Sequence, residues 1–262
     1  GKQIYKCFGC GAGGGSINFI MAVEKLEFIE AIKSLGDQYG IEVDINAGGK
    51  AKNLITQLFE LQNIAAEHYQ NNLKTSKGKL IIKYLHSRGI TDEIILRFKI
   101  GYSNKNWTSL LDKARKLELN SSSMIQSGLF INGEKGYFDR FRNRIMFPIK
   151  DRHNKIIAFA GRIFEGDDPA KYVNSSETPI YNKSAVLYGL SDSKKYLAKQ
   201  NVAIIVEGYL DYLQLYQAGI KNVAAVSGTA FTDSHAIELN KYVQTVKIAY
   251  DGDKAGKSAA IR

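Results

Sequence analysis

The residues best placed to do chemistry are carboxylates that follow apolar runs near the end of the chain. Glu207 directly follows one such run, and Asp251 and Asp253 follow another. On extended backbone, two positions apart, Asp251 and Asp253 would point to the same face. Carboxylates gathered at one point repel one another unless a cation neutralises them, and oxygen ligands favour Mg²⁺ or Mn²⁺. The pattern indicates a divalent-cation site that could hold phosphates and activate a hydroxyl for in-line displacement.

Strand-like and helical segments that alternate from residue 201 onward would bring these carboxylates together. Residues 202–206, 222–226 and 244–250 are strand-like, and a helix is expected at 209–218 with Asp211 in its first turn. Such alternation favours a parallel sheet with right-handed crossovers, whose ligands bind at the carboxyl ends of the strands. Taken alone, an Asp-Gly-Asp sequence is more often a turn. Its place at a second strand end of the same unit favours a shared site.

Basic residues form a second candidate feature, because Arg140, Arg142 and Arg144 occupy alternate positions. In a strand these side chains would share one face, and a row of guanidinium groups can bind phosphates in a bidentate manner. The spacing fits the solvated outer face of a sheet equally well. From residues 144–149 and 156–160, separated by a polar tetrapeptide, we expect a β-hairpin.

The two cysteines of the chain, Cys7 and Cys10, form one Cys-x-x-Cys pair near its beginning. A structural zinc site needs four ligands, and only one such pair is present. A redox role is disfavoured because no thioredoxin-like strand–helix–strand pattern surrounds the pair.

Composition limits the class of protein. The chain has 262 residues, a net charge of +10 and 44% hydrophobic residues, which is enough to build cores. Such a basic protein often binds a polyanion, most commonly nucleic acid, although a merely solvated surface is the alternative. Two cysteines favour a reducing, cytoplasmic compartment. No apolar run of membrane-spanning length and no signal peptide is seen.

Several motifs resemble those of bacterial DNA primases. The motifs at 207–211 (Glu-Gly-Tyr-Leu-Asp), 227–230 (Ser-Gly-Thr-Ala) and 251–256 (Asp-Gly-Asp-Lys-Ala-Gly) are similar to the Toprim domain of that family. The block 171–183 resembles a primase signature, and residues 6–16 resemble the second half of the primase zinc ribbon.

The resemblance covers nearly the whole chain and implies an α+β protein in several parts. It implies the remnant of a zinc-ribbon domain at 1–46, a linker at 47–51 and an α+β basic subdomain at 52–200. A truncated α/β Toprim domain with a parallel sheet is expected at 201–262. The chain reads as an internal fragment, so we expect further zinc ligands before Gly1 and a further acidic motif after Arg262.

The resemblance also implies roles for individual residues. Glu207, Asp251 and Asp253 would hold Mg²⁺ or Mn²⁺, and Asp211 would complete the catalytic group. Cys7 and Cys10 would hold Zn²⁺ in the full-length protein. The residues expected to bind nucleic acid or nucleotide are Arg140, Arg142, Arg144, Arg162, Lys171 and Lys183.

The activity implied is the synthesis of short RNA primers on single-stranded DNA, a nucleotidyl transfer that consumes ribonucleoside triphosphates. A further C-terminal domain would contact the replicative helicase. Alternatives are another Toprim enzyme such as a topoisomerase, a phage or plasmid primase-helicase, or a nucleic-acid binder without catalysis. The block 171–183 argues against a topoisomerase, and the intact carboxylates argue against a loss of catalysis. A haloacid dehalogenase-type phosphatase would carry Asp where Glu207 ends the first strand.

Overall fold

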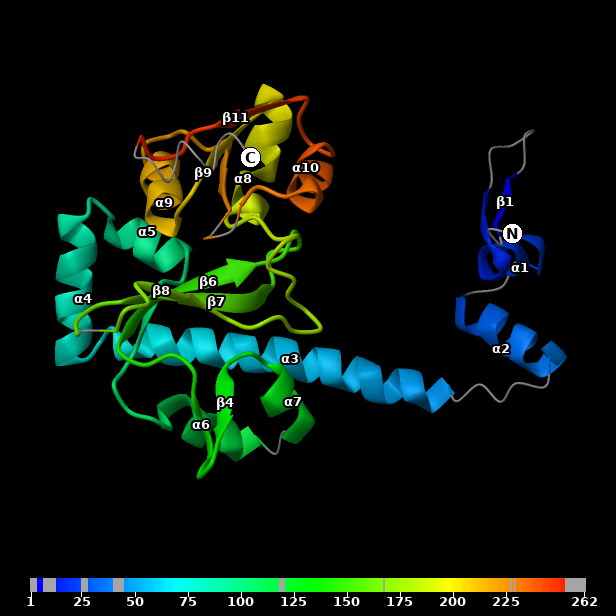
Figure 1. The fold of residues 1–262 in the computed structure, drawn as a ribbon, viewed down its shortest axis with the longest axis horizontal. Helices are drawn as coiled ribbons and strands as arrows, with labels where there is room; N and C mark the ends of the chain where they lie inside the picture. Colours follow the sequence, from blue (N-terminus) through cyan, green and yellow to red (C-terminus); the bar gives the residue numbers. More distant parts are fainter. Residues whose placement is uncertain are drawn as a thin grey trace. The chain divides into compact units, whose positions relative to one another are not determined.

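The computed structural model describes residues 4–6, 13–24, 28–39, 45–117, 121–166, 168–226, 228 and 230–252. The chain forms two compact units, Gly1–Leu54 and Ile55–Arg262 (Figure 1). Cys7, Cys10 and Asp253 lie outside the described residues, so their expected roles stay predictions.

The first unit contains a small antiparallel ribbon and helices. Strand β1 (Ile4–Lys6) pairs with β2 (Gly13–Gly15), and α1 (Ser16–Glu24) and α2 (Phe28–Tyr39) follow. The helix expected from Ser16 and the one expected at 28–39 are both confirmed.

A long helix, α3 (Ile45–Asn72), crosses the boundary between the two units. The flexible linker expected at 47–51 is wrong in its backbone conformation, because these residues are helical. Two glycines there lower helix propensity by about 1 kcal/mol each. No proline interrupts the segment, and extending an existing helix costs far less than starting a new one.

In the second unit, helices surround the larger sheet. The apolar stripe of α3 is part of the core, as its helical spacing predicted: Leu58, Leu61 and Ala65 are buried. Side chains of α3 pack in one cluster with Met146 and Phe159 of the sheet. The shorter helical elements are α4 (Ser76–Ser87), α5 (Asp92–Arg97), α6 (Ser109–Ala114), the 3₁₀ turn η1 (Arg115–Leu117) and α7 (Ser121–Gln126).

The larger sheet is antiparallel with the strand order β3-β6-β7-β8. Its strands are β3 (Gly101–Ser103), β6 (Arg144–Lys150), β7 (Ile156–Ile163) and β8 (Tyr172–Asn174). The expected β6–β7 hairpin is confirmed, and its turn is closed by the Asp151 carboxylate, which accepts the backbone N–H groups of His153 and Lys155. A separate ribbon pairs β4 (Phe130–Gly133) with β5 (Gly136–Asp139).

The last part of the chain forms the expected parallel sheet, with the order β10-β9-β11. Its elements are α8 (Leu190–Gln200), β9 (Val202–Val206), α9 (Tyr209–Gln217), β10 (Val223–Ala225), α10 (Asp233–Leu239) and β11 (Thr245–Ile248). Glu207 and Asp251 therefore follow two hydrogen-bonded neighbours, β9 and β11. Figure 1 shows this sheet and its helices on one side of β6 and β7, with α3 on the other side.

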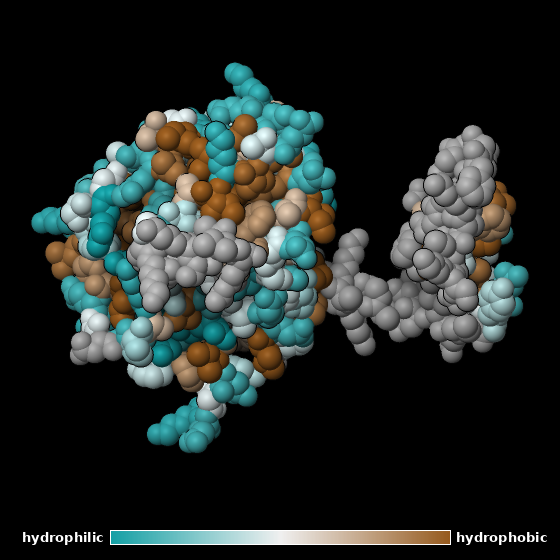
Figure 2. All heavy atoms as spheres, turned by 45° about the horizontal axis from the view of Figure 1, so that its top comes forward, coloured by the Kyte–Doolittle hydropathy of each residue, from teal (hydrophilic) through white to brown (hydrophobic). Residues whose placement is uncertain are grey.

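The surface mixes hydrophilic and hydrophobic side chains. Figure 2 shows hydrophobic (brown) and hydrophilic (teal) residues interspersed on the viewed face of the second unit. The most exposed large hydrophobic residues come from separate elements, for example Leu96, Ile237 and Trp107. Among the residues described, no helix combines the length and apolarity needed to cross a bilayer.

Candidate active site at the edge of the parallel sheet

Carboxylates and cations face one cavity of about 600 Å³ at the carboxyl edge of the parallel sheet. Glu207 and Asp251 come from the ends of β9 and β11, and Asp211 comes from the first turn of α9. The strand pattern in the sequence predicted this convergence. Positively charged residues from earlier in the second unit line the same cavity; these residues are Arg88, Arg162, Lys171 and Lys183.

Backbone hydrogen bonds hold the acidic edge in place. The Asp251 amide donates to Oε1 of Glu207 at 3.0 Å, which joins the ends of the two strands. The Gly208 amide donates to Oδ2 of Asp211 at 3.0 Å, so this carboxylate caps α9. A Cβ at Gly208 would lie 2.8 Å from that same oxygen. A larger residue at this position would therefore displace the Asp211 carboxylate from its capping position.

The electrostatics of the acidic edge suit a bound cation. Burial and then the nearby charge of Asp251 raise the pKa of Asp211, while the Gly208 amide and Lys171 oppose the rise. A cation close to Asp211 and Asp251 would relieve both desolvation and repulsion. All the donors are hard oxygens, which fits Mg²⁺ or Mn²⁺. Within the described residues no three acidic, His or Cys side chains form a group that could hold a metal. Asp253, the fourth expected carboxylate, lies outside them.

The cations that line the cavity come from β7, from the residue before β8, from the segment after β8 and from the end of α4. Arg162 lies over the ring of Tyr84, 4.9 Å from its centroid, and donates to the Ile163 carbonyl at 3.2 Å. Lys171 is exposed, and Lys183 is half-buried. Burial raises the pKa of the neighbouring Tyr172 to about 12, so its phenol stays neutral and can donate a hydrogen bond. Phosphate groups in this cavity would meet these cations, which line it together with the carboxylates.

The alternating arginines are not arranged as expected. Residues 140–143 are not in a strand, and β6 begins only at Arg144. Asn143 has φ 53°, and this left-handed conformation interrupts the extended backbone. The expectation that the three guanidinium groups share one strand face is therefore wrong. None of the three arginines lines the cavity that holds Glu207.

Each of these arginines has its own environment. Arg144 is buried and donates to the carbonyls of Gly161 at 3.1 Å and Ala170 at 2.9 Å, and it forms an ion pair with Asp168. Arg142 stacks on Trp107, with 4.1 Å between the guanidinium carbon and the ring centroid. Burial lowers the pKa of Arg140, the third of the group.

Sequence reasoning missed Arg88 and Gln214, which also line the cavity. The Gln214 side chain donates to the Arg88 carbonyl at 2.8 Å, across 126 positions of sequence. Gln217 of the same helix donates to the Gly89 carbonyl at 2.8 Å. In the sequence, Arg88 and Gly89 carry only the signal of a helix end. Their contacts with α9 are made by the fold, so no local pattern reveals them.

Comparison with known proteins agrees with this geometry. The family model for the DNA primase catalytic core, N-terminal domain, matches residues 68–194. A Toprim-like model matches residues 204–262, and a CHC2 zinc finger model matches residues 1–51. The crystal structure of the RNA polymerase domain of Mycobacterium tuberculosis primase is similar, with a TM-score of 0.74 and 30% identity over 79% of this chain and 70% of that one.

This chain belongs to the DNA primase family.

Other members of the primase family match over greater lengths. The DNA primase of Salmonella typhimurium is 38% identical over 266 residues, and that of Clostridium acetobutylicum is 40% identical over 268 residues. Both alignments cover 100% of this chain but only 46% and 44% of the relatives, so the chain spans about half their length. The Aquifex aeolicus primase structure, with zinc-binding and RNA polymerase domains, has a TM-score of 0.73 and 33% identity over 98% of this chain and 62% of that one.

Proposed function

We propose that this chain is part of a nucleotidyltransferase that makes short RNA primers on single-stranded DNA for replication. The observation that carries the proposal is the single cavity in which Glu207, Asp211 and Asp251 face Arg162, Lys171 and Lys183. In a primase-family fold, this arrangement suits a negatively charged triphosphate, because a cation-binding acidic edge and basic side chains line the same cavity. A related primase catalytic domain, 36% identical, has been solved bound to single-stranded DNA.

The acidic edge is the proposed catalytic group. Glu207, Asp251 and Asp253 would hold Mg²⁺ or Mn²⁺, and Asp211, whose carboxylate caps α9 through the Gly208 amide, would complete the catalytic group. A bound divalent cation supplies neutralisation of the triphosphate and activation of the attacking hydroxyl. The 3′-hydroxyl of the growing primer loses its proton to solvent, its oxygen bonds to the α-phosphorus of a ribonucleoside triphosphate, and the bond from that phosphorus to the departing pyrophosphate breaks. The protein contributes chiefly by aligning the two reactants.

The basic residues have separate proposed roles. Arg162, Lys171 and Lys183 would bind the triphosphate or the template backbone, because they share the cavity with the carboxylates. Arg140 and Arg142 would bind template phosphates further from the cavity. Arg144 was expected to do the same, but its guanidinium is buried and binds two carbonyls and the Asp168 carboxylate of its own chain, so we assign it to the fold.

The remaining proposals come from the family relationship. Cys7 and Cys10 would hold Zn²⁺ together with ligands outside this sequence, in agreement with the CHC2 zinc finger match. The full-length protein would work in the cytoplasm and contact the replicative helicase through a further domain.

Primer synthesis by the full-length protein tests the proposal. Glu207→Gln should abolish RNA synthesis on a single-stranded template while leaving template binding intact. Glu93→Gln, at an exposed position on α5, removes the same charge away from the cavity and should leave synthesis unchanged. Wild-type amounts of primer from Glu207→Gln would overturn the catalytic assignment.

A further inference from the structure

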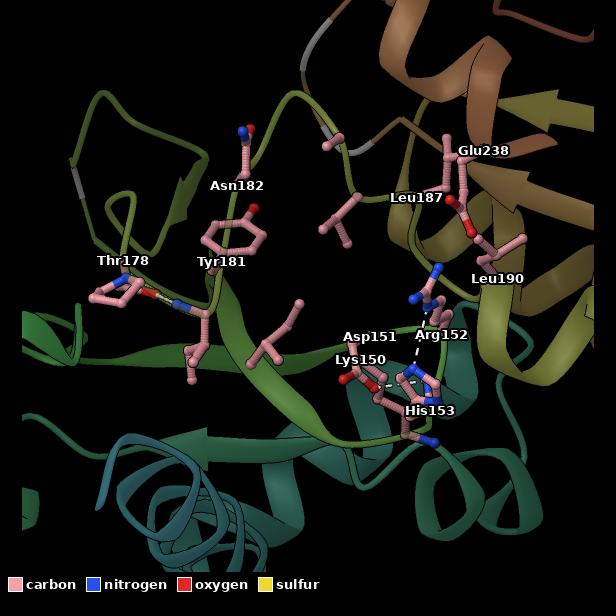
Figure 3. Close-up of a pocket in the computed structure, with 15 residues that line it drawn as sticks. Lys150, Asp151, Arg152, His153, Thr178, Tyr181, Asn182, Leu187, Leu190 and Glu238 are labelled. Atoms are coloured by element: carbon pink, nitrogen blue, oxygen red, sulfur yellow. Dashed lines mark hydrogen bonds between the residues drawn. The ribbon is translucent and has the colours of Figure 1, made fainter. Parts of the chain in front are cut away.

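A second cavity, of about 430 Å³, lies apart from the acidic edge (Figure 3). It is open to solvent, and its lining comes from the β6–β7 turn, the segment 178–187, the start of α8 and Glu238 of α10. None of the residues assigned above to catalysis or to phosphate binding lines it. Much of its lining is apolar; these residues are Ile157, Pro179, Ile180, Val186, Leu187 and Leu190. Its volume lies within the roughly 300–1,000 Å³ typical of small-molecule sites.

Polar groups stand at opposite ends of this cavity. Figure 3 shows Tyr181 and Asn182 at one end, with Arg152 and His153 at the other. Oδ1 of Asn182 accepts the backbone N–H and the hydroxyl of Ser184, at 3.0 and 2.7 Å. Its amide nitrogen therefore remains the group that can donate to a ligand. Burial raises the pKa of Tyr181, so its ring lines the cavity as a neutral surface.

The charges of the lining residues are largely paired, with one exception. Lys150 pairs with Asp192 at 3.2 Å, and Glu238 pairs with Lys241. Asp151 is occupied by the backbone N–H groups of its own turn. Arg152 donates from Nε to Nε2 of His153 at 3.1 Å. No ion pair joins Arg152 to a carboxylate in the part of the chain that the structure describes, so its guanidinium is available to a ligand.

We propose that this cavity is a second, non-catalytic site for a nucleoside monophosphate. The flat heterocycle would lie on the apolar lining, with its polar edge at the Asn182 amide. The phosphate would be bound by Arg152, because a guanidinium matches phosphate oxygens in a bidentate manner. An unpaired cation at one end, a donor at the other and an apolar surface between them fit such a ligand better than a wholly apolar molecule or a bare anion.

Binding of adenosine 5′-monophosphate to the chain, followed by calorimetry and by amide chemical shifts, tests this site. Arg152→Ala should weaken binding on the order of tenfold or more, because a charge-assisted hydrogen bond is lost. Lys155→Ala removes an equal charge from the same turn without lining the cavity, so it should have little effect. Glu238→Gln should tighten binding, since it removes a negative charge from the wall.

The assay must separate this cavity from the catalytic one, because Lys183, within the segment 178–187, lines the latter. A Lys171→Ala background should leave the shifts around Arg152 and Asn182 in place. Adenosine, which lacks the phosphate, should bind more weakly than the monophosphate. The proposal is overturned if binding at millimolar ligand is absent, if the shifts are confined to the surroundings of Glu207, or if Arg152→Ala binds like the wild type. Equal binding of adenosine would overturn the role of Arg152.

Discussion

The backbone amide of Asp251 donates a hydrogen bond of 3.0 Å to Oε1 of Glu207, across 44 positions of sequence. The bond joins the residues that follow two neighbouring parallel strands, β9 and β11. One carboxylate oxygen of Glu207 thus holds the backbone of Asp251, while the described hydrogen bonds leave its second oxygen for a cation. Glu207 therefore combines a structural contact with a proposed ligand role, and the two can be separated by substitution.

Glu207→Gln should keep the fold but bind the divalent cation more weakly. The amide oxygen of glutamine can still accept the Asp251 amide, so the thermal midpoint should stay close to that of the wild type. Binding of Mn²⁺, measured by calorimetry, should weaken by about tenfold or more, because a charged ligand is lost. Glu207→Ala should bind Mn²⁺ equally poorly and also lose about 1 kcal/mol of stability with the hydrogen bond. Unchanged Mn²⁺ affinity in both variants would contradict the ligand role.

Lys171→Ala and Lys183→Ala should each weaken binding of a single-stranded oligonucleotide in a salt-dependent way. Each lysine that neutralises a phosphate contributes about 0.7 to the slope of log K against log salt for single strands. Fluorescence anisotropy over a range of salt concentrations measures this slope. Lys199→Ala, at an exposed position near the end of α8, removes the same charge away from the cavity. If all three variants behave alike, net charge rather than the cavity governs binding.

Arg144→Ala should destabilise the second unit by about 3 kcal/mol. It leaves the carbonyl groups of Gly161 and Ala170 without this donor, and it removes the ion-pair partner of Asp168. Urea unfolding measures the loss. Arg142→Ala is the comparison at a half-buried guanidinium: it removes a cation–π contact with Trp107 and a hydrogen bond to the Asp139 carbonyl, and should cost less, about 1–2 kcal/mol. Normal stability of Arg144→Ala, together with weak template binding, would instead restore Arg144 to the phosphate-binding group.

Asp139 should make the stability of the second unit depend on pH. Its carboxylate accepts the N–H groups of Leu110 and Leu111 at the start of α6, at 2.8 and 2.9 Å, yet burial raises its pKa to about 6. The folded state therefore binds a proton more tightly than the unfolded state. The resulting stability is fully present below about pH 4, and it is lost as the pH rises through about 6.

Asp139→Asn should remove this part of the pH dependence. Between pH 4 and pH 7 the urea midpoint of the wild type should fall as the pH rises, because Asp139 loses its proton. The midpoint of the variant should change less over the same range. Glu134→Gln, at an exposed carboxylate in the turn between β4 and β5, serves as the control and should follow the wild type. Parallel profiles for the wild type and Asp139→Asn would contradict the raised pKa.

Local patterns were sufficient for much of the fold and for the acidic half of the site. Helical spacing predicted α2 and the buried stripe of α3, and alternating strand and helix signals predicted the parallel order around β9. Once that order is known, Glu207 and Asp251 must meet, because neighbouring parallel strands end at the same edge of a sheet. These features depend on periodicity and on chain direction, both of which can be read from the sequence.

Other features were decided only by the tertiary structure. Arg88 reaches the cavity because Gln214 of α9 binds its carbonyl, a contact that no local pattern encodes. The alternation of Arg140, Arg142 and Arg144 suggested one shared face, but a left-handed Asn143 ends the extended backbone and packing turns Arg144 inward. Spacing specifies where a side chain points only while the backbone stays regular. Whether a guanidinium binds solvent, a ligand or its own chain depends on partners that only folding brings within reach.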